Sequence, residues 1–232
     1  MERKTALVSD ETYHIFNRGA HRQAIFTGDT DKDRFLLLLY LFNASEPVVM
    51  RDVLAKYKGR SYGEAFVNEK PEQRLVDILA FALMTNHFHL VLRQLSENGI
   101  SQFMKKLCTS YSMYFNEKYE HSGTLFQGRF RSNHIDTEAY FRWIFTYVHL
   151  NPIEIVDHNW KRGVKDKDRV RQFMAKYKYS SFYDYSVGKR QESMILAAQD
   201  TVPDFLHTQN DLEELLSDYS RGKFIYSDSD VA

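Results

Sequence analysis

The sequence predicts an α+β fold in which helices pack on an antiparallel sheet. Short runs rich in β-branched and aromatic residues alternate along the chain with longer runs whose apolar residues recur at helical spacing. Two of the β-rich runs are separated only by Thr85 and Asn86, a link short enough for a hairpin turn. A composition of 43% hydrophobic and 27% charged residues is typical of a globular protein rather than a disordered one.

The first part of the chain is expected to begin with a strand. Residues 12–16 alternate in character and are followed by a glycine-containing turn signal. Residues 29–43 have an acidic start and an apolar stripe, which predicts a helix. A second helix is expected near residues 48–57, and the polar residues 58–73 that follow are expected to form a connector.

The middle of the chain supplies three further strands and two long helices. Residues 76–84 and 87–93 are the second and third strands, and residues 129–135 the fourth. Residues 100–119 and 136–150 carry apolar stripes at helical spacing. The resulting order of strand, helix, strand, strand, helix, strand is the ferredoxin-like split βαβ arrangement, with an extra helix after the fourth strand.

Charge is distributed unevenly, although the net charge is zero. Residues 161–178 contain eight bases and two acids, whereas the residues from 189 onward contain four bases and nine acids. The basic stretch could follow a phosphate backbone, or it could be an exposed helix face with ion pairs. We therefore divide the chain into a domain over 1–187 and an acidic, mainly helical extension over 188–232, which could be an oligomer contact or a cover over the basic surface.

Several classes of protein are disfavoured. The sequence contains no apolar run of about eighteen residues and no basic-then-apolar leader, so we expect no membrane segment and a cytoplasmic location. Cys108 is the only cysteine, which rules out an internal disulfide and a cysteine-based zinc site.

The segment Met84-Thr85-Asn86-His87-Phe88-His89-Leu90 places two histidines on one face of the third strand. Two imidazoles held side by side form a natural half-site for a divalent metal. The alternative is that both histidines are polar residues on the solvent face of the sheet. If they bind a metal, activity should fall as the pH drops below the ordinary histidine pKa of about 6.5.

A second half of such a site could come from the helix at 136–150. Tyr147 and Asn151 lie four residues apart, so they project from the same side of that helix. If this side faced the two histidines, two nitrogens and one oxygen would be available to Mn²⁺ or Mg²⁺, with a tyrosine beside a bound phosphate. The alternative is an amphipathic surface tyrosine and an asparagine that ends its helix.

Four motifs that follow one another along the chain favour the metal site over these alternatives. They are Tyr13-His14-Ile15-Phe16-Asn17-Arg18-Gly19, the histidine segment, Gly123-Thr124-Leu125-Phe126-Gln127-Gly128-Arg129-Phe130, and Tyr147-Val148-His149-Leu150-Asn151-Pro152. They span about residues 13–156, and the sequence resembles a REP-associated tyrosine transposase of the single-tyrosine HUH insertion-sequence family. The resemblance implies a ferredoxin-like fold, Tyr147 as nucleophile, and His87, His89 and Asn151 as ligands of a divalent Mg or Mn ion. It also implies single-stranded DNA with hairpins as the partner.

Residues outside the metal site are expected to bind the DNA. Arg18, Arg129 and Arg131 lie in the resembling motifs and could meet phosphates or hairpin bases, and Lys161, Arg162 and Lys165 begin the basic stretch. Phe126 could stack on an unpaired base or could anchor its loop in the core.

The resulting function is a metal-dependent single-stranded DNA transesterase that cuts and rejoins strands near hairpins through a 5′-phosphotyrosine intermediate. Four alternatives remain open. The protein could be a catalytically silent hairpin binder, a replication- or relaxase-like nickase, or a ferredoxin-like small-ligand module that binds no nucleic acid. Tyr111 or Tyr114 could replace Tyr147 as nucleophile, although Tyr111 fits an apolar stripe. The sequence leaves open whether the protein acts as a monomer or a homodimer.

Overall fold

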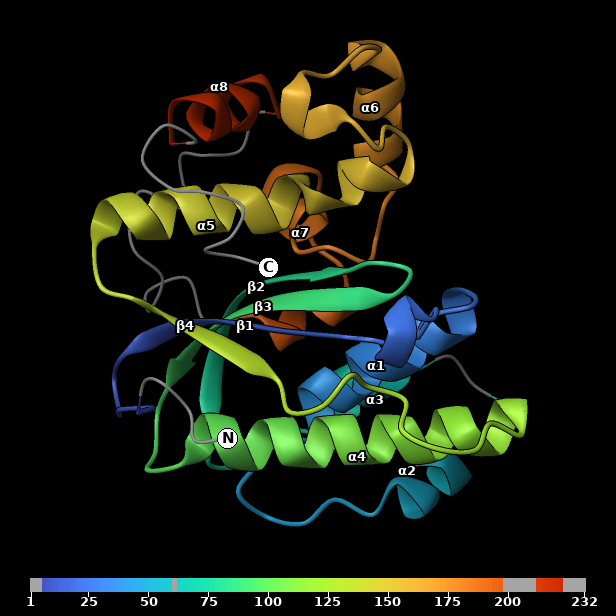
Figure 1. The fold of residues 1–232 in the computed structure, drawn as a ribbon. Helices are drawn as coiled ribbons and strands as arrows, with labels where there is room; N and C mark the ends of the chain where they lie inside the picture. Colours follow the sequence, from blue (N-terminus) through green and yellow to red (C-terminus); the bar gives the residue numbers. More distant parts are fainter. Residues whose placement is uncertain (1–5, 60–61, 198–211, 223–232) are drawn as a thin grey trace.

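An antiparallel sheet of four strands runs through the middle of the molecule (Figure 1). The computed structural model describes residues 6–59, 62–197 and 212–222. The strands are β1 (Thr12–Arg18), β2 (Val76–Leu83), β3 (His87–Gln94) and β4 (Arg131–Ile135). They lie in the order β2-β3-β1-β4, and each neighbouring pair is antiparallel. This order confirms the ferredoxin-like α+β fold expected from the sequence.

One face of the sheet is covered by α1 (Asp29–Leu41) and α4 (Gly99–Tyr119), as Figure 1 shows. The apolar alternation of the strands faces these helices, because Ile15 of β1 and Leu90 of β3 lie in the same buried cluster as Phe35 and Phe103. Both helices lie within two residues of the bounds predicted from the sequence at each end. The shorter α2 (Met50–Lys56) and α3 (Gly63–Asn68) follow α1.

Helix α3 corrects the expectation of a connector over residues 58–73. Its six residues are too few to show a helical period in the sequence. Ala65 and Phe66 are nevertheless fully buried, and the Phe66 ring lies 5.1 Å from that of Tyr40 on α1. Tertiary packing of this aromatic pair, rather than a local pattern, holds the helix in place.

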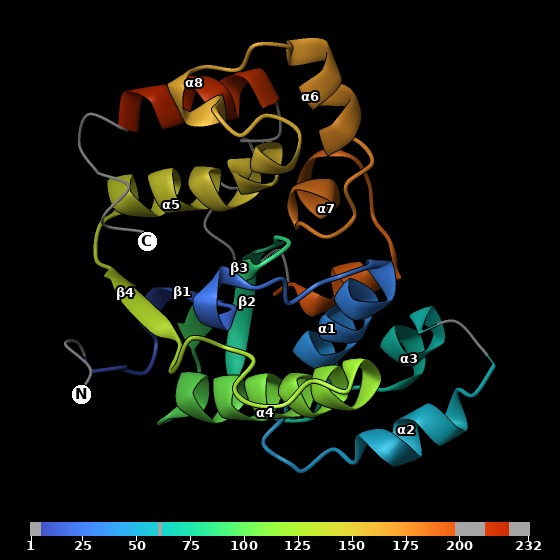
Figure 2. The ribbon, with the colours of Figure 1, turned by 45° about the vertical axis from the view of Figure 1, so that its right-hand side comes forward.

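The other face of the sheet is covered by α5 (Glu138–Leu150). Thr137 caps this helix, accepting a hydrogen bond from the Tyr140 amide at 3.2 Å. Helices α6 (Lys167–Met174) and α8 (Leu212–Gly222) lie on the far side of α5 from the sheet, with α7 (Phe182–Ser186) beside it (Figure 2). Because α5 is enclosed between the sheet and these helices, every residue from 143 to 150 is buried.

Four short 3-10 helices complete the description: η1 (Ala20–Arg22), η2 (Asn151–Ile155), η3 (Trp160–Arg162) and η4 (Gln191–Ile195). The described part of the acidic extension consists of residues 188–197, which include η4, and of α8. The rest of the extension, which the sequence predicts to be mainly helical, lies outside the described residues. None of the helices in the described ranges is long and apolar enough to cross a membrane.

Strand β2 contains an irregularity that sets how closely α5 can approach. Its register against β3 shifts between Ile78 and Ala80, so one extra residue is accommodated there. As a result the large side chains at 78, 81 and 83 all join the cluster beneath α1 and α4. Leu79 and the small Ala80 and Ala82 lie in the cluster beneath α5, and at the two alanines the helix can lie close to the sheet.

The outer edge of β2 is covered by the chain that follows α6. Leu83 donates to the Tyr179 carbonyl at 2.9 Å, and Ser181 donates to the Phe81 carbonyl at 2.9 Å. Further along, Ala197 donates to the Ile78 carbonyl at 2.9 Å. Residues 179–197 thus form hydrogen bonds with backbone groups of β2 that would be unpaired at a free sheet edge.

Candidate active site

His87 and His89 lie on the face of the sheet that α5 covers. The alternation of β3 sends Phe88 into the opposite cluster and leaves the two imidazoles side by side, with ring centroids 5.0 Å apart. His89 is 3% exposed, and His87 is half-buried at the start of its strand. The solvent-face alternative does not describe these histidines, because a helix packs over them.

Helix α5 brings Tyr147 and Asn151 to the same place. The Tyr147 ring lies 5.4 Å from that of His89, nearly perpendicular to it at 85°, and Tyr147 is 5% exposed. The Asn151 side chain interacts with His87. The four side chains predicted for the site therefore come together, from a strand and a helix some sixty residues apart in the sequence. Tyr147, His89 and Asn151 are buried, so the surface-tyrosine alternative does not describe Tyr147.

Several polar atoms of this group are buried without hydrogen-bond partners among the described residues. They are Nε2 of His89 and both amide atoms of Asn151, whose approach to His87 does not complete a hydrogen bond of ordinary geometry. Each unsatisfied buried polar group costs about 1–3 kcal/mol. Imidazole nitrogen and amide oxygen are ligands that a divalent cation accepts, so the donor set fits such an ion. No three His, Cys, Asp or Glu side chains in the described ranges could hold a metal, so the set would need Asn151.

Burial keeps both histidines neutral. Removal from water lowers the pKa of His87 to about 4, against a smaller raising effect of Asn151, and the positive charges of Arg18 and Lys161 lower it further. Burial likewise lowers the pKa of His89 well below its ordinary value. Neutral imidazole is the form that binds a metal. Protonation of His87 is therefore expected nearer pH 4 than the 6.5 expected from the sequence, and the pKa of His89 is shifted in the same direction.

His14 is a member of this group that the sequence reasoning missed. It is fully buried on β1, and its Nε2 lies 2.9 Å from Nδ1 of His89, with the two rings nearly parallel at 14°. The alternation of the first strand does place His14 on the face opposite Tyr13 and Ile15. The contact with His89 could not be predicted, because it depends on how β1 pairs with β3.

Aromatic and basic side chains surround Tyr147. The indole of Trp143, one helical turn earlier, stacks on its ring at 5.7 Å, and Tyr219 of α8 stacks at 6.4 Å. Nζ of Lys161 lies over the ring, 5.1 Å from its centroid. Trp143 could have been found from its spacing of four residues. Tyr219 could not, because nothing local links α8 to α5.

The remaining basic residues predicted to bind DNA lie at the surface around this group. Arg18 ends β1 directly opposite His87 in the register of β1 and β3. Arg129 is exposed just before β4, and Arg131 is exposed at its first residue. Arg162, the last residue of η3, and Lys165, which precedes α6, are also exposed. The positive charges of Arg18 and Lys161 lower the pKa of His87, whereas the other four have no such effect on His87 or His89.

Phe126 does not lie at the surface. It is 7% exposed, its ring packs against Phe88 at 6.0 Å and Tyr111 at 6.4 Å, and its backbone pairs with Gly19. Of the two alternatives raised from the sequence, this placement corresponds to the core anchor, and stacking on a base would require the ring to leave this packing.

Both alternative nucleophiles lie on the α1 and α4 side of the sheet, opposite to the side that holds His87 and His89. Tyr111 is fully buried beneath α1 and donates its hydroxyl hydrogen to the Ile25 carbonyl. Tyr114 donates to the Asp31 carboxylate at 2.9 Å. Burial raises the pKa of Tyr114 to about 12 and that of Tyr111 further still. Neither tyrosine is therefore near His87 or His89.

A cavity of about 570 Å³ opens between η3 and α8, and two of its lining residues, Lys161 and Tyr219, contact the Tyr147 ring. Trp160, Lys161, Arg162 and Lys167 line one side, and Glu213 and Tyr219 of α8 line the other. Glu213 also pairs with Lys167 at 2.8 Å and with Arg171 at 3.2 Å. Part of the basic stretch is thus engaged by the acidic extension, while Lys161 and Arg162 face the cavity.

Comparison with known proteins gives a family match. The model of the family described as "Transposase IS200 like" matches residues 7–151, which include His14, His87, His89, Tyr147 and Asn151. Among solved structures, that of a REP-associated tyrosine transposase bound to a REP hairpin aligns with 14% identity and a TM-score of 0.44, covering 80% of this chain and 84% of that one. A tRNA(His) guanylyltransferase from Saccharomyces cerevisiae aligns with 8% identity and a TM-score of 0.36, covering 89% and 86%. No curated protein matches the sequence.

Proposed function

The chain belongs to the IS200-like transposase family, and from that premise we propose that it is a metal-dependent enzyme that cuts and rejoins single-stranded DNA beside hairpins. The observation that carries the proposal is the meeting of Tyr147 with His87, His89 and Asn151 in one buried group. A group of this kind contains a nucleophile, two neutral imidazoles and an unsatisfied amide. That combination suits phosphoryl transfer to a tyrosine.

Tyr147 is the proposed nucleophile. A tyrosine hydroxyl is a weak nucleophile at neutral pH unless its proton is removed or its target is activated. In the proposed step the hydroxyl oxygen bonds to the scissile phosphorus, the bond to the 3′ oxygen breaks, and the proton leaves the tyrosine as the 3′ oxygen becomes a hydroxyl. The downstream strand is then joined to Tyr147 through its 5′ phosphate. Attack by a second 3′-hydroxyl reverses the chemistry, so no nucleotide cofactor is needed.

His87, His89 and Asn151 are the proposed metal ligands. A divalent Mg or Mn ion bound there would polarise the scissile phosphate and stabilise the charge that develops during transfer. Nε2 of His89 and the Asn151 amide support this assignment, because both are buried and lack partners in the described ranges. Burial also keeps the imidazoles neutral, so the lone pairs are available at physiological pH.

The basic side chains around the group are the proposed DNA contacts. Lys161, over the Tyr147 ring, places a positive charge where both the tyrosine oxygen and the scissile phosphate would be stabilised. Arg18 supplies a second charge at the His87 end. The cavity lined by Trp160, Lys161 and Arg162 is large enough for a nucleotide next to the scissile bond. Exposed Arg129, Arg131 and Lys165 would contact phosphates farther along the strand or hairpin.

The proposal is tested by a covalent-adduct assay. The protein is incubated with Mn²⁺ and end-labelled single-stranded hairpin DNA, then run on a denaturing gel beside Tyr147→Phe and the control Tyr111→Phe. We expect DNA from the downstream side to be attached to wild type and Tyr111→Phe, to be absent from Tyr147→Phe, and to disappear with a chelator.

The possible results separate the proposed enzyme from its rivals. A free 3′-hydroxyl oligonucleotide that becomes joined to the trapped strand would support a transposase over a nickase. Retarded DNA on a native gel without any adduct would identify a silent hairpin binder. An adduct that survives Tyr147→Phe and disappears in Tyr111→Phe would overturn the assignment of the nucleophile.

A further inference from the structure

We propose that His14 is a positioning residue that fixes the tautomer and orientation of His89, so that Nε2 of His89 faces the metal site. This inference rests on the proposed function, since it concerns the metal ligands of that site. His14 would act through His89 and would not itself touch the metal or the DNA.

The geometry of the pair carries the inference. Nε2 of His14 and Nδ1 of His89 are 2.9 Å apart, and both residues are buried. A hydrogen bond between two neutral imidazoles needs one N–H and one lone pair. A His89 that offers the Nε2 lone pair to a metal carries its hydrogen on Nδ1 and must donate it. His14 is placed to accept that hydrogen, with its own hydrogen on Nδ1.

Packing holds His14 in the orientation that this hydrogen bond requires. The Phe16 ring stacks on His14 with centroids 4.9 Å apart, and it contacts His89 at 5.9 Å. Phe16 lies directly opposite His89 in the register of β1 and β3, so it fills the space beside both imidazoles. On the other side the edge of the His14 ring meets Tyr147 at 6.4 Å. A rotation of either histidine would therefore break close packing on both strands.

His14 is a poor choice for stability alone. Its Nδ1 is buried with no hydrogen-bond partner among the described residues. An apolar side chain of similar size would avoid that cost of about 1–3 kcal/mol. Within the described ranges, the one polar interaction of the His14 side chain is the one with His89, which points to positioning as the reason for the histidine.

His149 provides a matched control. It is likewise fully buried, its Nε2 pairs with the Ser181 hydroxyl at 2.7 Å, and its Nδ1 also lacks a partner in the described ranges. Its ring packs against Phe145 and Tyr185, toward α7 rather than toward His89. A change at His149 therefore perturbs a buried histidine of the same kind without touching the proposed ligands.

The first test measures Mn²⁺ affinity by titration calorimetry in the full-length protein. We expect His14→Leu to bind Mn²⁺ about 10- to 100-fold more weakly than wild type, as is usual when the partner of a metal-binding histidine is lost. His14→Gln should bind more tightly than His14→Leu, because its amide oxygen can accept the hydrogen from His89. His149→Gln should match wild type. Equal affinity in wild type and a folded His14→Leu would overturn the inference, whatever the cleavage assay shows.

A second test needs no variant and covers the case in which His14→Leu does not fold. The wild-type protein is labelled with ¹⁵N in its histidines and examined with Mg²⁺ by long-range ¹H–¹⁵N correlation, which reports which ring nitrogen carries hydrogen. We expect hydrogen on Nδ1 of both His14 and His89. Hydrogen on Nε2 of His89 would overturn the inference. If wild type binds metal with this tautomer and yet forms no DNA adduct, the positioning role stands and the proposed catalytic function fails.

Discussion

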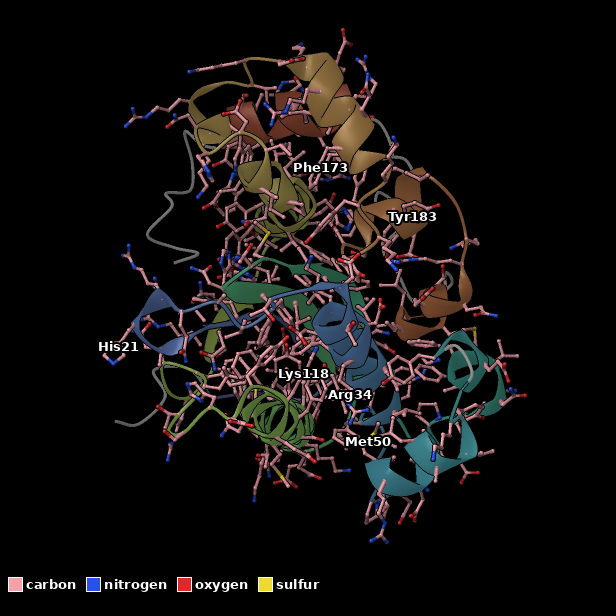
Figure 3. The ribbon with its side chains drawn as sticks, turned by 90° about the vertical axis from the view of Figure 1, so that its right-hand side faces the viewer. His21, Arg34, Met50, Lys118, Phe173 and Tyr183 are labelled. Carbon is pink, nitrogen blue, oxygen red and sulfur yellow. The ribbon has the colours of Figure 1, made fainter. Side chains whose placement is uncertain are left out.

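Two buried polar groups on opposite sides of the sheet, one around Asp31 and one beneath α5, differ in how far the protein satisfies their hydrogen bonds. Between α1 and α4, the Asp31 carboxylate is fully buried and accepts hydrogen bonds from Thr27, Tyr114, Lys118 and Tyr119, at 2.6–2.9 Å. Figure 3 shows Lys118 and the neighbouring Arg34 on this side of the molecule. Beneath α5, by contrast, His14, His89 and Asn151 each keep at least one buried atom without a partner in the described ranges.

This difference separates a polar network that is complete within the protein from one that a ligand could complete. Each Asp31 oxygen accepts hydrogen bonds from the protein itself, so the carboxylate has no capacity left for a ligand and its contribution is to stability. The group beneath α5 carries an energetic cost in the isolated chain, which a ligand would relieve. The feature that distinguishes the group beneath α5 is that unsatisfied nitrogen and oxygen atoms of His89 and Asn151 lie beside Tyr147 and His87.

The largest expected effect that tests this comparison is the response to acid. Burial lowers the pKa of His14 and of His149 to about 3, so stability is complete above the unfolded value near 6.5 and is lost as the pH falls toward 3. Burial alone would raise the pKa of Asp31, but hydrogen bonds from Lys118, Thr27 and Tyr119 lower it to about 2. Its contribution is therefore lost only between about pH 4 and pH 2. A shift of one pKa unit corresponds to about 1.4 kcal/mol, so each histidine should contribute more than Asp31 to the loss of unfolding free energy in acid.

Urea unfolding at a series of pH values measures how much the histidines and Asp31 each contribute to the loss of stability in acid. The free energy of unfolding should begin to fall below about pH 6.5, and His149→Gln should reduce that slope. Asp31→Asn should change the pH dependence only below about pH 4. An unchanged slope between pH 7 and pH 4.5 in His149→Gln would contradict the assignment of the acid response to the α5 side.

The next largest effect is expected from Asp31→Ala. Removing the carboxylate leaves the Lys118 ammonium and two tyrosine hydroxyls without their acceptor, and breaking a buried pair costs about 3–5 kcal/mol. We expect a loss near the lower limit, because the Lys118 side chain is 33% exposed. Urea unfolding at pH 7 measures the loss, and Mn²⁺ affinity should stay at the wild-type value. An Asp31→Ala variant as stable as wild type would show that the hydrogen bonds of the Asp31 network do not stabilise the fold.

Asn151→Leu should have a much smaller effect on stability and a large one on metal binding. The two side chains are similar in size, and the substitution removes a buried amide that has no partner in the described ranges. We expect the free energy of unfolding to change by less than about 1 kcal/mol or to rise, while Mn²⁺ binding weakens. A loss of several kcal/mol would instead show that the amide is satisfied in the folded protein and would weaken its assignment as a ligand.

The smallest effect is expected on the outer surface of α5. Arg142 pairs there with Glu138 at 2.7 Å, and both side chains are largely exposed. Because such a pair between residues four apart is worth about 0.3–0.5 kcal/mol, Arg142→Ala should barely change urea unfolding. The same substitution should leave Mn²⁺ binding unchanged. A loss of unfolding free energy as large as that of Asp31→Ala would show that solvent exposure does not explain the difference between the Arg142–Glu138 pair and the Asp31 network.

The features of the candidate site that depend on local sequence pattern could be predicted from the sequence. The alternation of 87–93 placed both histidines on one face, and the spacing of Tyr147 and Asn151 placed them on one side of a helix. His14 could not be assigned a role, because its contact with His89 depends on the register between β1 and β3. The position of Phe126 in the core and the packing of α8 on α5 depend likewise on contacts between distant segments, which periodicity does not encode.

The cover on β2 limits how far the protein can be shortened. The segment that matches the family ends at residue 151, before the residues that pair with the outer edge of β2. A chain cut at that point would keep Tyr147 and the proposed metal ligands, and it would expose an apolar strand with unpaired backbone groups. Such an edge is a template for pairing with another copy of the same strand. We expect a fragment of residues 1–151 to aggregate, and we expect the full chain to stay monodisperse because residues 179–197 cover this edge.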